Sequence, residues 1–284
     1  MKIGIVGLGV VGGSLAIGLK GQEKYQIYGL DHNAETISKA KAMGIIVDGS
    51  TSPENILPKV DVVILALYPT DVAPFVEENQ EFFSKKVLLV DLSGIKIYTI
   101  ANLSGKLPTG MEAVFAHPMA GREKKGLDYA SGEVNRGANF LITPLPENQE
   151  ESLVFVETLA KDAGFGKITR LSPEEHDAMI AYTSQLPHAM AVALVNSDGQ
   201  VEKTMDFIGD SYRDLTRIAS INEDLWSELF LGNRVELLKT IEQFEASLDD
   251  IKNALVDNDP TKLKGIFAES NARKEIMQKN QKSS

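Results

Sequence analysis

Short apolar runs alternate with longer amphipathic stretches through the first 170 residues. Several runs are almost continuously apolar, such as residues 60–67, which is typical of strands in a parallel sheet covered on both faces. We therefore expect residues 1–170 to form an α/β domain with a doubly wound sheet of about seven or eight strands. The predicted strands are 3–6, 26–30, 60–67, 86–91, 112–117, 139–143 and 166–171, with a helix over 150–163 between the last two.

From residue 171 onward the strand pattern gives way to helical periodicity. Ser172 is a predicted N-cap, Pro173 fits the first helical position, and Glu175 completes a capping box. The apolar residues of 223–256 fall largely on one stripe, with charged residues opposite. Residues 171–284 are therefore predicted to be an all-α domain that follows the sheet domain. The predicted helices are 173–196 with a kink at Pro187, 210–219, 222–256 and 260–279.

The chain begins with the sequence features of a dinucleotide-binding fold. After the first strand, Gly7, Gly9 and Gly12 form a G-x-G-x-x-G loop that opens a helix-compatible segment. Gly7 permits a tight turn, Gly9 lets a pyrophosphate approach the backbone, and Gly12 lets the helix pack on the strand. Asp31 ends the second strand, about 20 residues past Gly12, where a carboxylate can bind ribose hydroxyls. This predicts a Rossmann-type domain whose cofactor contacts are Gly7, Leu8, Gly9, Val10, Val11, Gly12 and Asp31, with Leu67 and Pro69 after a further strand.

Asp31 also bears on which dinucleotide is bound. A carboxylate at this place repels a ribose phosphate, and the next residues, His32 and Asn33, include no arginine to hold one. We therefore expect the cofactor to be NAD rather than NADP. A glycine-rich turn in an unrelated α/β protein would leave the placement of Asp31 unexplained.

Composition narrows the range of partners. The 284 residues carry a net charge of −11, which argues against nucleic acid and anionic lipid surfaces. Cysteine is absent, which excludes disulfides and thiolate metal sites, and we expect no metal. The N-terminus enters a strand without a signal peptide, and we expect no apolar run long enough to span a membrane. A cytoplasmic location is therefore expected, and an anionic substrate would require a local cluster of positive charge.

The four histidines are the candidates for acid–base chemistry. His117 ends a predicted strand at the same sheet edge as the glycine loop, where it can face a nicotinamide and act as hydrogen-bond acceptor or general base. His32 is expected in a surface loop, and His176 on the exposed side of the first turn of a helix. His188 lies one helical turn from Ser184, so a structural hydrogen bond is the alternative to a role in binding.

Two arginines supply local positive charge. Arg213 and Arg217 are four positions apart and are therefore expected on one helical face. A guanidinium group binds a carboxylate through two parallel hydrogen bonds, which indicates an anion site. The alternative is an ion pair on the surface between Asp214 and Arg217.

Three further motifs occur in order along the chain. They are His-Pro-Met-Ala-Gly-x-Glu at 117–123, Gln-Leu-Pro-His at 185–188, and Arg-Asp-Leu-Thr-Arg-Ile-Ala at 213–219, followed by Trp226. Together with the glycine loop, these motifs resemble those of the prephenate and arogenate dehydrogenases of tyrosine biosynthesis. The resemblance implies NAD-dependent oxidative decarboxylation of prephenate to 4-hydroxyphenylpyruvate, or of arogenate to tyrosine. It also implies a homodimer formed through the helical domain.

The resemblance assigns roles to individual residues. His117 matches the family's catalytic histidine, which binds the ring hydroxyl, and Arg217 matches the arginine that holds a substrate carboxylate. His188 matches the histidine of the Leu-Pro-His motif. Arg213 and Glu123 are assigned with it to substrate binding.

The chain departs from the family pattern in two places. The family loop after the strand that ends at Asp91 usually reads Asp-x-Gly-Ser-x-Lys, with a serine that contacts the substrate hydroxyl. Here the order is Ser93-Gly94, so the candidate catalytic serine is Ser93, one position early. The family also often has Ser-His-Leu-Pro-His where this chain has glutamine at position 185.

Two other classes of protein stay open. One is an NAD-linked dehydrogenase of the 3-hydroxyacid type, which has a sheet domain followed by helices but relies on a catalytic lysine in the helical domain. The other is a non-catalytic NAD-binding sensor whose helical domain is a dimerisation or partner surface. Whether hydroxyphenylpyruvate or tyrosine tightens NAD binding would discriminate the sensor from the enzyme. No residue reports on the choice between prephenate and arogenate.

Overall fold

The computed structural model describes residues 1–121 and 124–282, with side chains as far as residue 279. Glu123, an expected substrate contact, lies outside the described residues. The chain divides into two compact units, Met1–Arg234 and Val235–Ser284. The first unit groups the sheet with the helices that directly follow it, and the predicted domain boundary at residues 170 and 171 falls inside this unit and stays a prediction.

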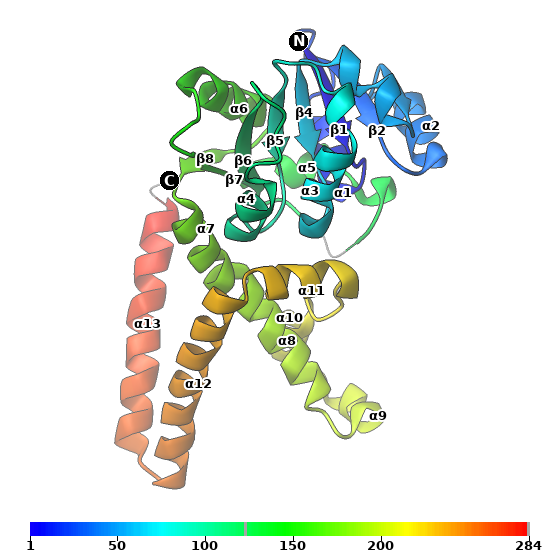
Figure 1. Ribbon diagram of the computed structural model, residues 1–284. Coiled ribbons are helices and arrows are strands. Elements are labelled where there is room, and N and C mark those ends of the chain that lie inside the picture. Colours follow the sequence, from blue (N-terminus) through cyan, green and yellow to red (C-terminus); the bar gives the residue numbers. More distant parts are fainter. Residues whose placement is uncertain (122–123, 283–284) are drawn as a thin grey trace. The chain divides into compact units, whose positions relative to one another are not determined.

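The described part of the first unit contains an eight-stranded sheet with the order β3-β2-β1-β4-β5-β6-β7-β8 (Figure 1). Strands β1 to β6 run parallel to one another, β7 pairs with β6 antiparallel, and β8 is parallel to β7. This confirms the predicted doubly wound sheet. Strand β3 was not predicted because its three residues have no apolar side chain. The strands are β1 Lys2–Val6, β2 Gln26–Leu30, β3 Asp48–Ser50, β4 Val62–Leu65, β5 Leu88–Asp91, β6 Glu112–Pro118, β7 Asn139–Thr143 and β8 Lys167–Arg170.

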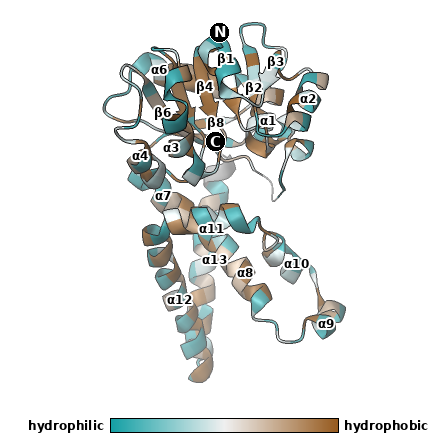
Figure 2. Cartoon of the chain, turned by 45° about the vertical axis from the view of Figure 1, so that its right-hand side comes forward, coloured by the Kyte–Doolittle hydropathy of each residue, from teal (hydrophilic) through white to brown (hydrophobic). Residues whose placement is uncertain are grey.

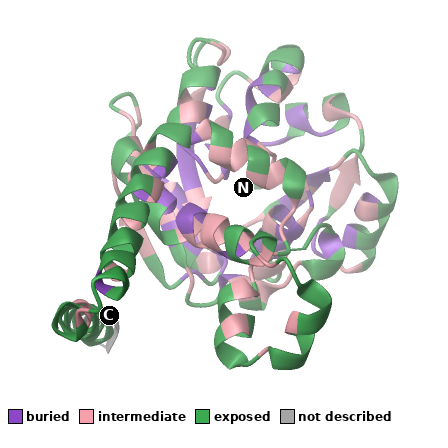
Figure 3. Cartoon of the chain, turned by 90° about the horizontal axis from the view of Figure 1, so that it is seen from below, coloured by how far each residue is buried: buried purple, intermediate pink, exposed green. Residues whose placement is uncertain are grey.

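Alternate residues of the strands face two separate hydrophobic cores. In β4, Val62 and Ile64 belong to the first core, and Val63 and Leu65 to the second. Residues of α1, α2 and α6 complete the first core, and residues of α3 and α4 the second, so that buried residues gather on the strands (Figure 3). Because both faces of the sheet are covered, the strands are almost continuously apolar. These helices are α1 Val10–Gly18, α2 Ala34–Ala42, α3 Pro69–Glu78, α4 Ile97–Leu103 and α6 Glu150–Asp162, with the short α5 Gly132–Asn135 before β7.

The helices after β8 follow the predicted order, with a change of helix type in the first of them. The predicted capping box between Ser172 and Glu175 is present at the start of α7. A π-helical turn then leads into α8, where the Leu186 N–H bonds the Ala181 carbonyl. Pro187 has no N–H to donate, so a local change in backbone hydrogen bonding accommodates it. These elements are α7 Pro173–Ile180, the π-helical turn Ala181–Gln185, α8 Leu186–Asn196, α9 Val201–Thr204, α10 Asp210–Thr216 and α11 Glu223–Gly232.

The continuous helix Pro173–Asn196 is long and apolar enough, by length and composition alone, to cross a membrane. The prediction that no apolar run reaches this length is therefore wrong. The helix nevertheless carries the buried polar residues His176, Asp177 and Gln185, each hydrogen-bonded to another part of the first unit. Buried polar groups with protein partners are typical of a helix in the core of a folded unit. Packing within this unit buries 28% of the most apolar window of the helix, so it accounts for part of the apolar composition.

The second unit consists, in its described part, of α12 and α13. The single helix predicted over 222–256 is divided at Asn233, whose φ of −114° and ψ of 25° are not helical. Large apolar residues are exposed on both helices. Brown segments mark apolar residues along α12 (Figure 2). The helices are α12 Arg234–Val256 and α13 Pro260–Lys282, and the exposed residues are Val235, Leu238, Leu248, Leu255, Val256, Phe267, Ile276 and Met277.

Candidate active site

The loops that carry the predicted site residues meet at one edge of the sheet. Strands β1, β4, β5 and β6 are parallel, so their carboxyl ends lie together, which is where ligands bind in open α/β sheets. The glycine loop follows β1, residues 66–69 follow β4, residues 92–96 follow β5, and His117 lies near the end of β6. Strand alternation places Asp91 and His117 on the side of the second core, with α3 and α4.

The glycine loop has the backbone geometry that a bound pyrophosphate needs. Gly7 has a φ of 86°, and a Cβ there would lie 2.5 Å from the carbonyl oxygen of Ala66. A Cβ on Gly12 would lie 2.0 Å from the Gly7 carbonyl oxygen, so only glycine permits this close packing. Gly9 is different, because no described atom lies within 4 Å of a Cβ built there. Gly9 is also the N-cap of α1 and gives it no side-chain cap, so the helix N-terminus faces open space and fits an anion.

Asp31 stands beside this loop because β2 pairs with β1. Its carboxylate accepts hydrogen bonds from the backbone N–H groups of Leu8, at 2.9 Å, and Asn33, at 2.9 Å. A carboxylate offers about four acceptor positions, so two further hydrogen bonds can be made. Asp31 thus holds the glycine loop in place and can still accept hydrogen bonds from ribose hydroxyls. The residues present fit a dinucleotide at this place.

The end of β4 adds a second wall to the predicted cofactor site. Pro69 is the first residue of α3 and is buried, and Leu67 is half-buried beside it. Helix α11 packs on this segment, where Asn222 donates to the Tyr68 hydroxyl at 2.6 Å and the Thr70 N–H donates to Glu228. The helices after the sheet therefore reach the edge at which the cofactor is expected.

His117 is the start of a buried line of hydrogen bonds. Its Nδ1 lies 2.9 Å from Nε2 of His176, and Nδ1 of His176 lies 2.7 Å from Oδ1 of Asp177. Asp177 also accepts from the backbone N–H groups of Lys96, at 2.8 Å, and Ile97, at 2.9 Å, and thereby caps α4. His176 and Asp177 are fully buried. The expectation that His176 lies on an exposed helix surface is therefore wrong.

A second buried cluster supports the loop beneath His117. The Lys96 ammonium lies 2.5 Å from Oδ2 of Asp91, and both side chains are fully buried. The Ser93 hydroxyl also contacts Oδ2 of Asp91, at 2.8 Å, the Ile95 carbonyl and the Thr99 hydroxyl. One hydroxyl has a single donor and two acceptor positions, so these contacts use its capacity. The geometry does not support the prediction that Ser93 is the catalytic serine, since its side chain points into this cluster.

Gly94 is the residue of this loop that faces the His117 ring. A Cβ on Gly94 would lie 3.8 Å from Nε2 of His117 and 2.9 Å from the side chain of Leu229. The ring nitrogen that is not bonded to His176 therefore points toward Gly94 and α11. In the family order the serine would stand at this position, so the exchange of serine and glycine removes a hydroxyl next to the ring.

Burial keeps both histidines of the line neutral. It lowers the pKa of His117 well below the ordinary histidine value, and His176 and the Lys96 ammonium lower that pKa further. Burial also lowers the pKa of His176, against the opposing effect of the hydrogen bond to Asp177. A neutral His117 has one ring nitrogen with a free electron pair, which is what a general base requires.

The predicted substrate contacts lie on the helices after the sheet. Arg213 is in α10 and pairs with Asp210 at 3.1 Å, and Arg217 is the C-cap of the same helix. Nδ1 of His188 lies 2.8 Å from the Ser184 carbonyl, which confirms the structural hydrogen bond weighed for it. The ring of His188 also stacks on Trp226, with centroids 3.7 Å apart.

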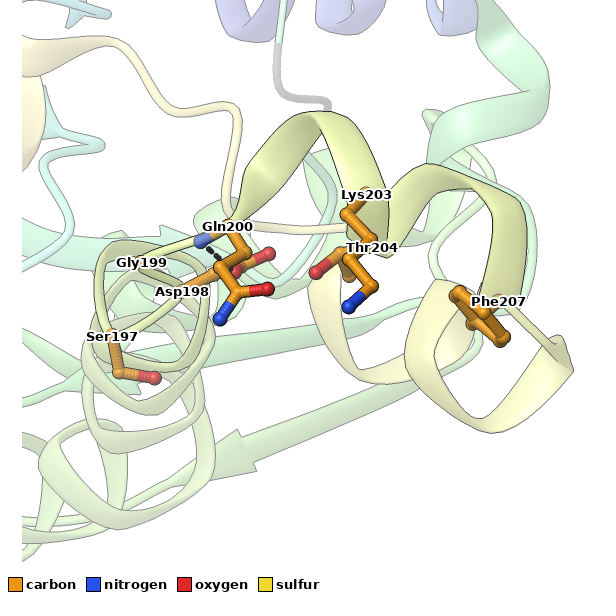
Figure 4. Close-up of a pocket in the computed structure, with 7 residues that line it drawn as sticks. All are labelled: Ser197, Asp198, Gly199, Gln200, Lys203, Thr204 and Phe207. Atoms are coloured by element: carbon orange, nitrogen blue, oxygen red, sulfur yellow. Dashed lines mark hydrogen bonds between the residues drawn. The ribbon is translucent and has the colours of Figure 1, made fainter.

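A separate hollow, drawn in Figure 4, lies away from these groups. It has a volume of about 460 Å³ and is formed by the turn after α8 together with α9 and the residues that follow. Within it, the Gln200 N–H donates to Asp198, and the Gln200 carbonyl accepts from the N–H groups of Lys203 and Thr204. Its lining holds none of the predicted site residues, and we assign no chemistry to it. The lining residues are Ser197, Asp198, Gly199, Gln200, Lys203, Thr204 and Phe207.

His176 and Asp177 were missed as site residues, although the sequence holds a signal for them. They precede Ile180 and Ala181 by four positions, so the four residues share one face of a helix. Ile180 and Ala181 are an apolar pair, and all four are buried. A histidine and an aspartate on the apolar face of a helix indicate a buried polar network. This signal is stronger than the position of His176 next to the capping box, from which an exposed side chain was predicted.

Two family models match the chain. One is described as prephenate dehydrogenase, nucleotide-binding domain, and matches residues 15–168. The other is described as prephenate dehydrogenase, dimerization domain, and matches residues 172–269. Together they cover the parts of the chain that carry His117, the His176–Asp177 pair and the two arginines, whereas the glycine loop precedes the first match.

Individual relatives agree with these matches. The chain is 27% identical over 274 residues to the cyclohexadienyl dehydrogenase of Zymomonas mobilis, covering 94% of this chain and 93% of that protein. It is 26% identical to the prephenate dehydrogenase of Bacillus subtilis, covering 93% of this chain and 72% of that protein. Its fold is similar to the crystal structure of prephenate dehydrogenase from Aquifex aeolicus in complex with hydroxyphenyl propionate and NAD⁺, with a TM-score of 0.88, 31% identity and 98% of each chain covered. On these matches, the chain belongs to the prephenate dehydrogenase family.

Proposed function

We propose that this chain catalyses the NAD-dependent oxidative decarboxylation of prephenate to 4-hydroxyphenylpyruvate, a step of tyrosine biosynthesis. The observation that carries the proposal is the position of His117. It stands with a neutral ring nitrogen that faces Gly94, at the sheet edge that also holds the glycine loop and Asp31. A base at this edge can act on a substrate placed beside the cofactor.

In the proposed mechanism, His117 accepts a proton and the side chains around it limit the access of water. Bound NAD supplies the acceptor for the hydride that leaves the ring carbon bearing the hydroxyl group. Nε2 of His117 accepts the hydroxyl proton, which favours loss of the hydride. Carbon dioxide leaves from the opposite ring carbon, and formation of the aromatic ring drives the reaction forward. The Leu229 side chain covers Gly94 next to His117, which limits the access of water on that side.

The substrate is proposed to be held by its carboxylates. Arg217 is the proposed anchor, with Arg213 and His188 as further contacts on α10 and α8. Glu123 keeps its proposed role in substrate binding. A guanidinium group suits this task because it can donate two parallel hydrogen bonds to one carboxylate. In a chain with a net charge of −11, local arginines are needed to attract a dianionic substrate.

The second unit is proposed to form a homodimer with its counterpart. The exposed apolar side chains of α12 and α13 and the match to a dimerization domain support this proposal. We further propose that nucleic acid and membrane are not partners of the enzyme, on the support of its negative charge.

The reaction is tested by NADH or NADPH formation with purified protein in four combinations. Prephenate and arogenate are each supplied with NAD and with NADP. The proposal expects turnover with NAD, with prephenate preferred over arogenate. Preferred turnover of arogenate would make the chain an arogenate dehydrogenase. NAD binding without turnover of either acid would contradict an enzymatic function and favour a sensor.

The coenzyme preference is tested by replacing Asp31 with serine. Loss of charge-assisted hydrogen bonds to the ribose is expected to raise the KM for NAD by about 10- to 100-fold. The KM for NADP is expected to fall, because the charge that repels its phosphate is gone. Steady-state kinetics with both coenzymes measure the effect, and Glu35→Gln on the exposed side of α2 is the matched control. An unchanged KM for NAD would show that Asp31 does not bind the ribose.

The pH profile of kcat/KM tests the state of His117. The proton is accepted by neutral His117, and burial holds its pKa well below the ordinary value of 6.5. The charged and titratable groups around it are His176, Asp177, Lys96 and Asp91. Activity is therefore expected to persist as the pH falls through 6.5 and to be lost only at clearly lower pH. An acidic limb at or above that value would contradict a neutral, buried base.

A further inference from the structure

The line of hydrogen bonds His117–His176–Asp177 ends at the Asp177 carboxylate, whose contacts determine which atom donates in each bond of the line. The backbone N–H groups of Lys96 and Ile97 each point at a different carboxylate oxygen of Asp177. A backbone N–H can only donate, so both oxygens act as acceptors. The contact of 2.7 Å between Oδ1 of Asp177 and Nδ1 of His176 is then a hydrogen bond donated by His176.

This direction passes through His176 to His117. A neutral histidine carries one N–H, so when Nδ1 of His176 is protonated its Nε2 has a free electron pair. That Nε2 accepts a hydrogen bond, and the atom within reach is Nδ1 of His117, at 2.9 Å. Nδ1 of His117 is therefore the protonated nitrogen of its ring. Its Nε2, which faces Gly94, keeps the free electron pair.

We propose that His176 and Asp177 are positioning residues that hold His117 in the tautomer with the proton on Nδ1, so that Nε2 is the base. This inference rests on the proposed role of His117 in the reaction. Neither residue faces solvent, since both side chains are fully buried. They act through the hydrogen bond to His117 and contact neither substrate nor cofactor.

The same line of hydrogen bonds also interacts with the positive charge that forms on the His117 ring during the reaction. When Nε2 of His117 accepts the substrate proton, the ring becomes a cation with N–H groups on both sides. Its Nδ1–H continues to donate to His176, and the carboxylate of Asp177 lies at the far end of the same line. A negative charge at this distance in a buried site offsets part of the cost of placing a cation on His117.

The backbone around the pair is itself held in place. The side-chain amide of Asn233 donates to the Asp177 carbonyl and to the Gln185 side chain, each at 2.9 Å. Gln185 in turn donates to the Leu229 carbonyl at 2.8 Å. These contacts tie α7 to α11, whose Leu229 covers Gly94 beside His117. Packing contacts therefore hold both the Asp177 end and the His117 end of the hydrogen-bonded line in place.

The tautomer can be observed directly by NMR. The chain has four histidines, so ¹⁵N-detected ring signals of the labelled protein can be assigned with His→Gln variants. In the free wild-type protein at neutral pH, we expect His117 to show a protonated Nδ1 and an unprotonated Nε2. A His117 with the proton on Nε2 would overturn the inference. This measurement needs no substrate and no turnover.

Asp177→Asn is the most informative variant. An amide can donate to Nδ1 of His176, which moves the His176 proton to Nε2 and the His117 proton to Nε2 as well. The base is then blocked, so kcat is expected to fall by about 10²- to 10⁴-fold with little change in the KM for prephenate. The NMR signals of His117 are expected to report the changed tautomer. Unchanged kcat, or loss of kcat without a change of tautomer, would contradict the role of Asp177.

His176→Gln and Glu174→Gln complete the set. Asp177 also caps α4, so Tm is measured for every variant, and His176→Gln leaves that cap in place. A glutamine amide offers either an oxygen or an N–H to His117, so it no longer fixes the tautomer, and kcat is again expected to fall. Glu174 lies on the exposed side of α7, and its variant is expected to match the wild type in kcat and tautomer. Wild-type kcat in His176→Gln would contradict the role of His176.

The proposed reaction and the proposed positioning role of His176 and Asp177 can be contradicted separately. If His117→Asn keeps its turnover, the proposed role of His117 is wrong even though its tautomer has been established by NMR. If NADH forms but the wild-type ring carries its proton on Nε2, the reaction stands and the positioning role of His176 and Asp177 is wrong.

Discussion

Replacing His117 with asparagine is expected to lower kcat by about 10²- to 10⁴-fold, which is the usual contribution of a positioned acid–base group. The asparagine side chain has no nitrogen with a free electron pair, so it cannot accept the hydroxyl proton. The glycine loop and Asp31 are untouched by the change, because they lie after β1 and β2. NAD binding is therefore expected to stay near the wild-type level.

The measurement combines steady-state kinetics with prephenate and calorimetric titration with NAD. The matched control is Glu54→Gln, an exposed position away from the site, which is expected to leave both quantities unchanged. Near-full turnover of His117→Asn at saturating substrate would show that another group accepts the proton. A parallel loss of NAD binding would instead indicate that the variant disturbs the fold of the sheet edge.

Asp91→Asn is expected to lower the free energy of unfolding by about 3–5 kcal/mol, because it leaves a buried ammonium group without its opposite charge. Lys96 and Asp91 are 2.5 Å apart and fully buried, and burial already lowers the pKa of Lys96. In the variant, Lys96 binds fewer protons in the folded state than in the unfolded state. The stability of the variant is therefore expected to rise with pH relative to the wild type.

Urea denaturation at fixed protein concentration, evaluated by linear extrapolation, measures the loss. The matched control is Asp249→Asn, which breaks an exposed ion pair with Lys252 and is expected to have no measurable effect. Adding Lys96→Met to Asp91→Asn is expected to recover part of the stability, since the unpaired charge is removed. A single variant as stable as the wild type would contradict a structural role of this pair.

The fold was largely predictable because its signals are local. Apolar runs in the first 170 residues predicted the strands. The capping box of Ser172 and Glu175 predicted that α7 begins at Pro173. The parallel arrangement then determines that the glycine loop and His117 share one edge of the sheet. The short β3 escaped prediction because nothing in its composition favours a strand.

The inner arrangement of the site was not predictable in the same way. Whether His176 is exposed depends on the packing of α7 near α4, where Asp177 caps a helix that is distant in sequence. The direction of the Ser93 side chain depends on the turn after β5 and on the buried Asp91 that attracts its hydroxyl. Both are decided by tertiary contacts, which the local pattern does not contain.

Simultaneous release of carbon dioxide and NADH from prephenate and NAD is the direct test of the proposed reaction. We expect equal amounts of both products with the wild-type protein, at a rate that falls in His117→Asn. NADH without carbon dioxide would show an oxidation that is not coupled to decarboxylation. Neither product, from a protein that binds NAD, would contradict the proposed reaction.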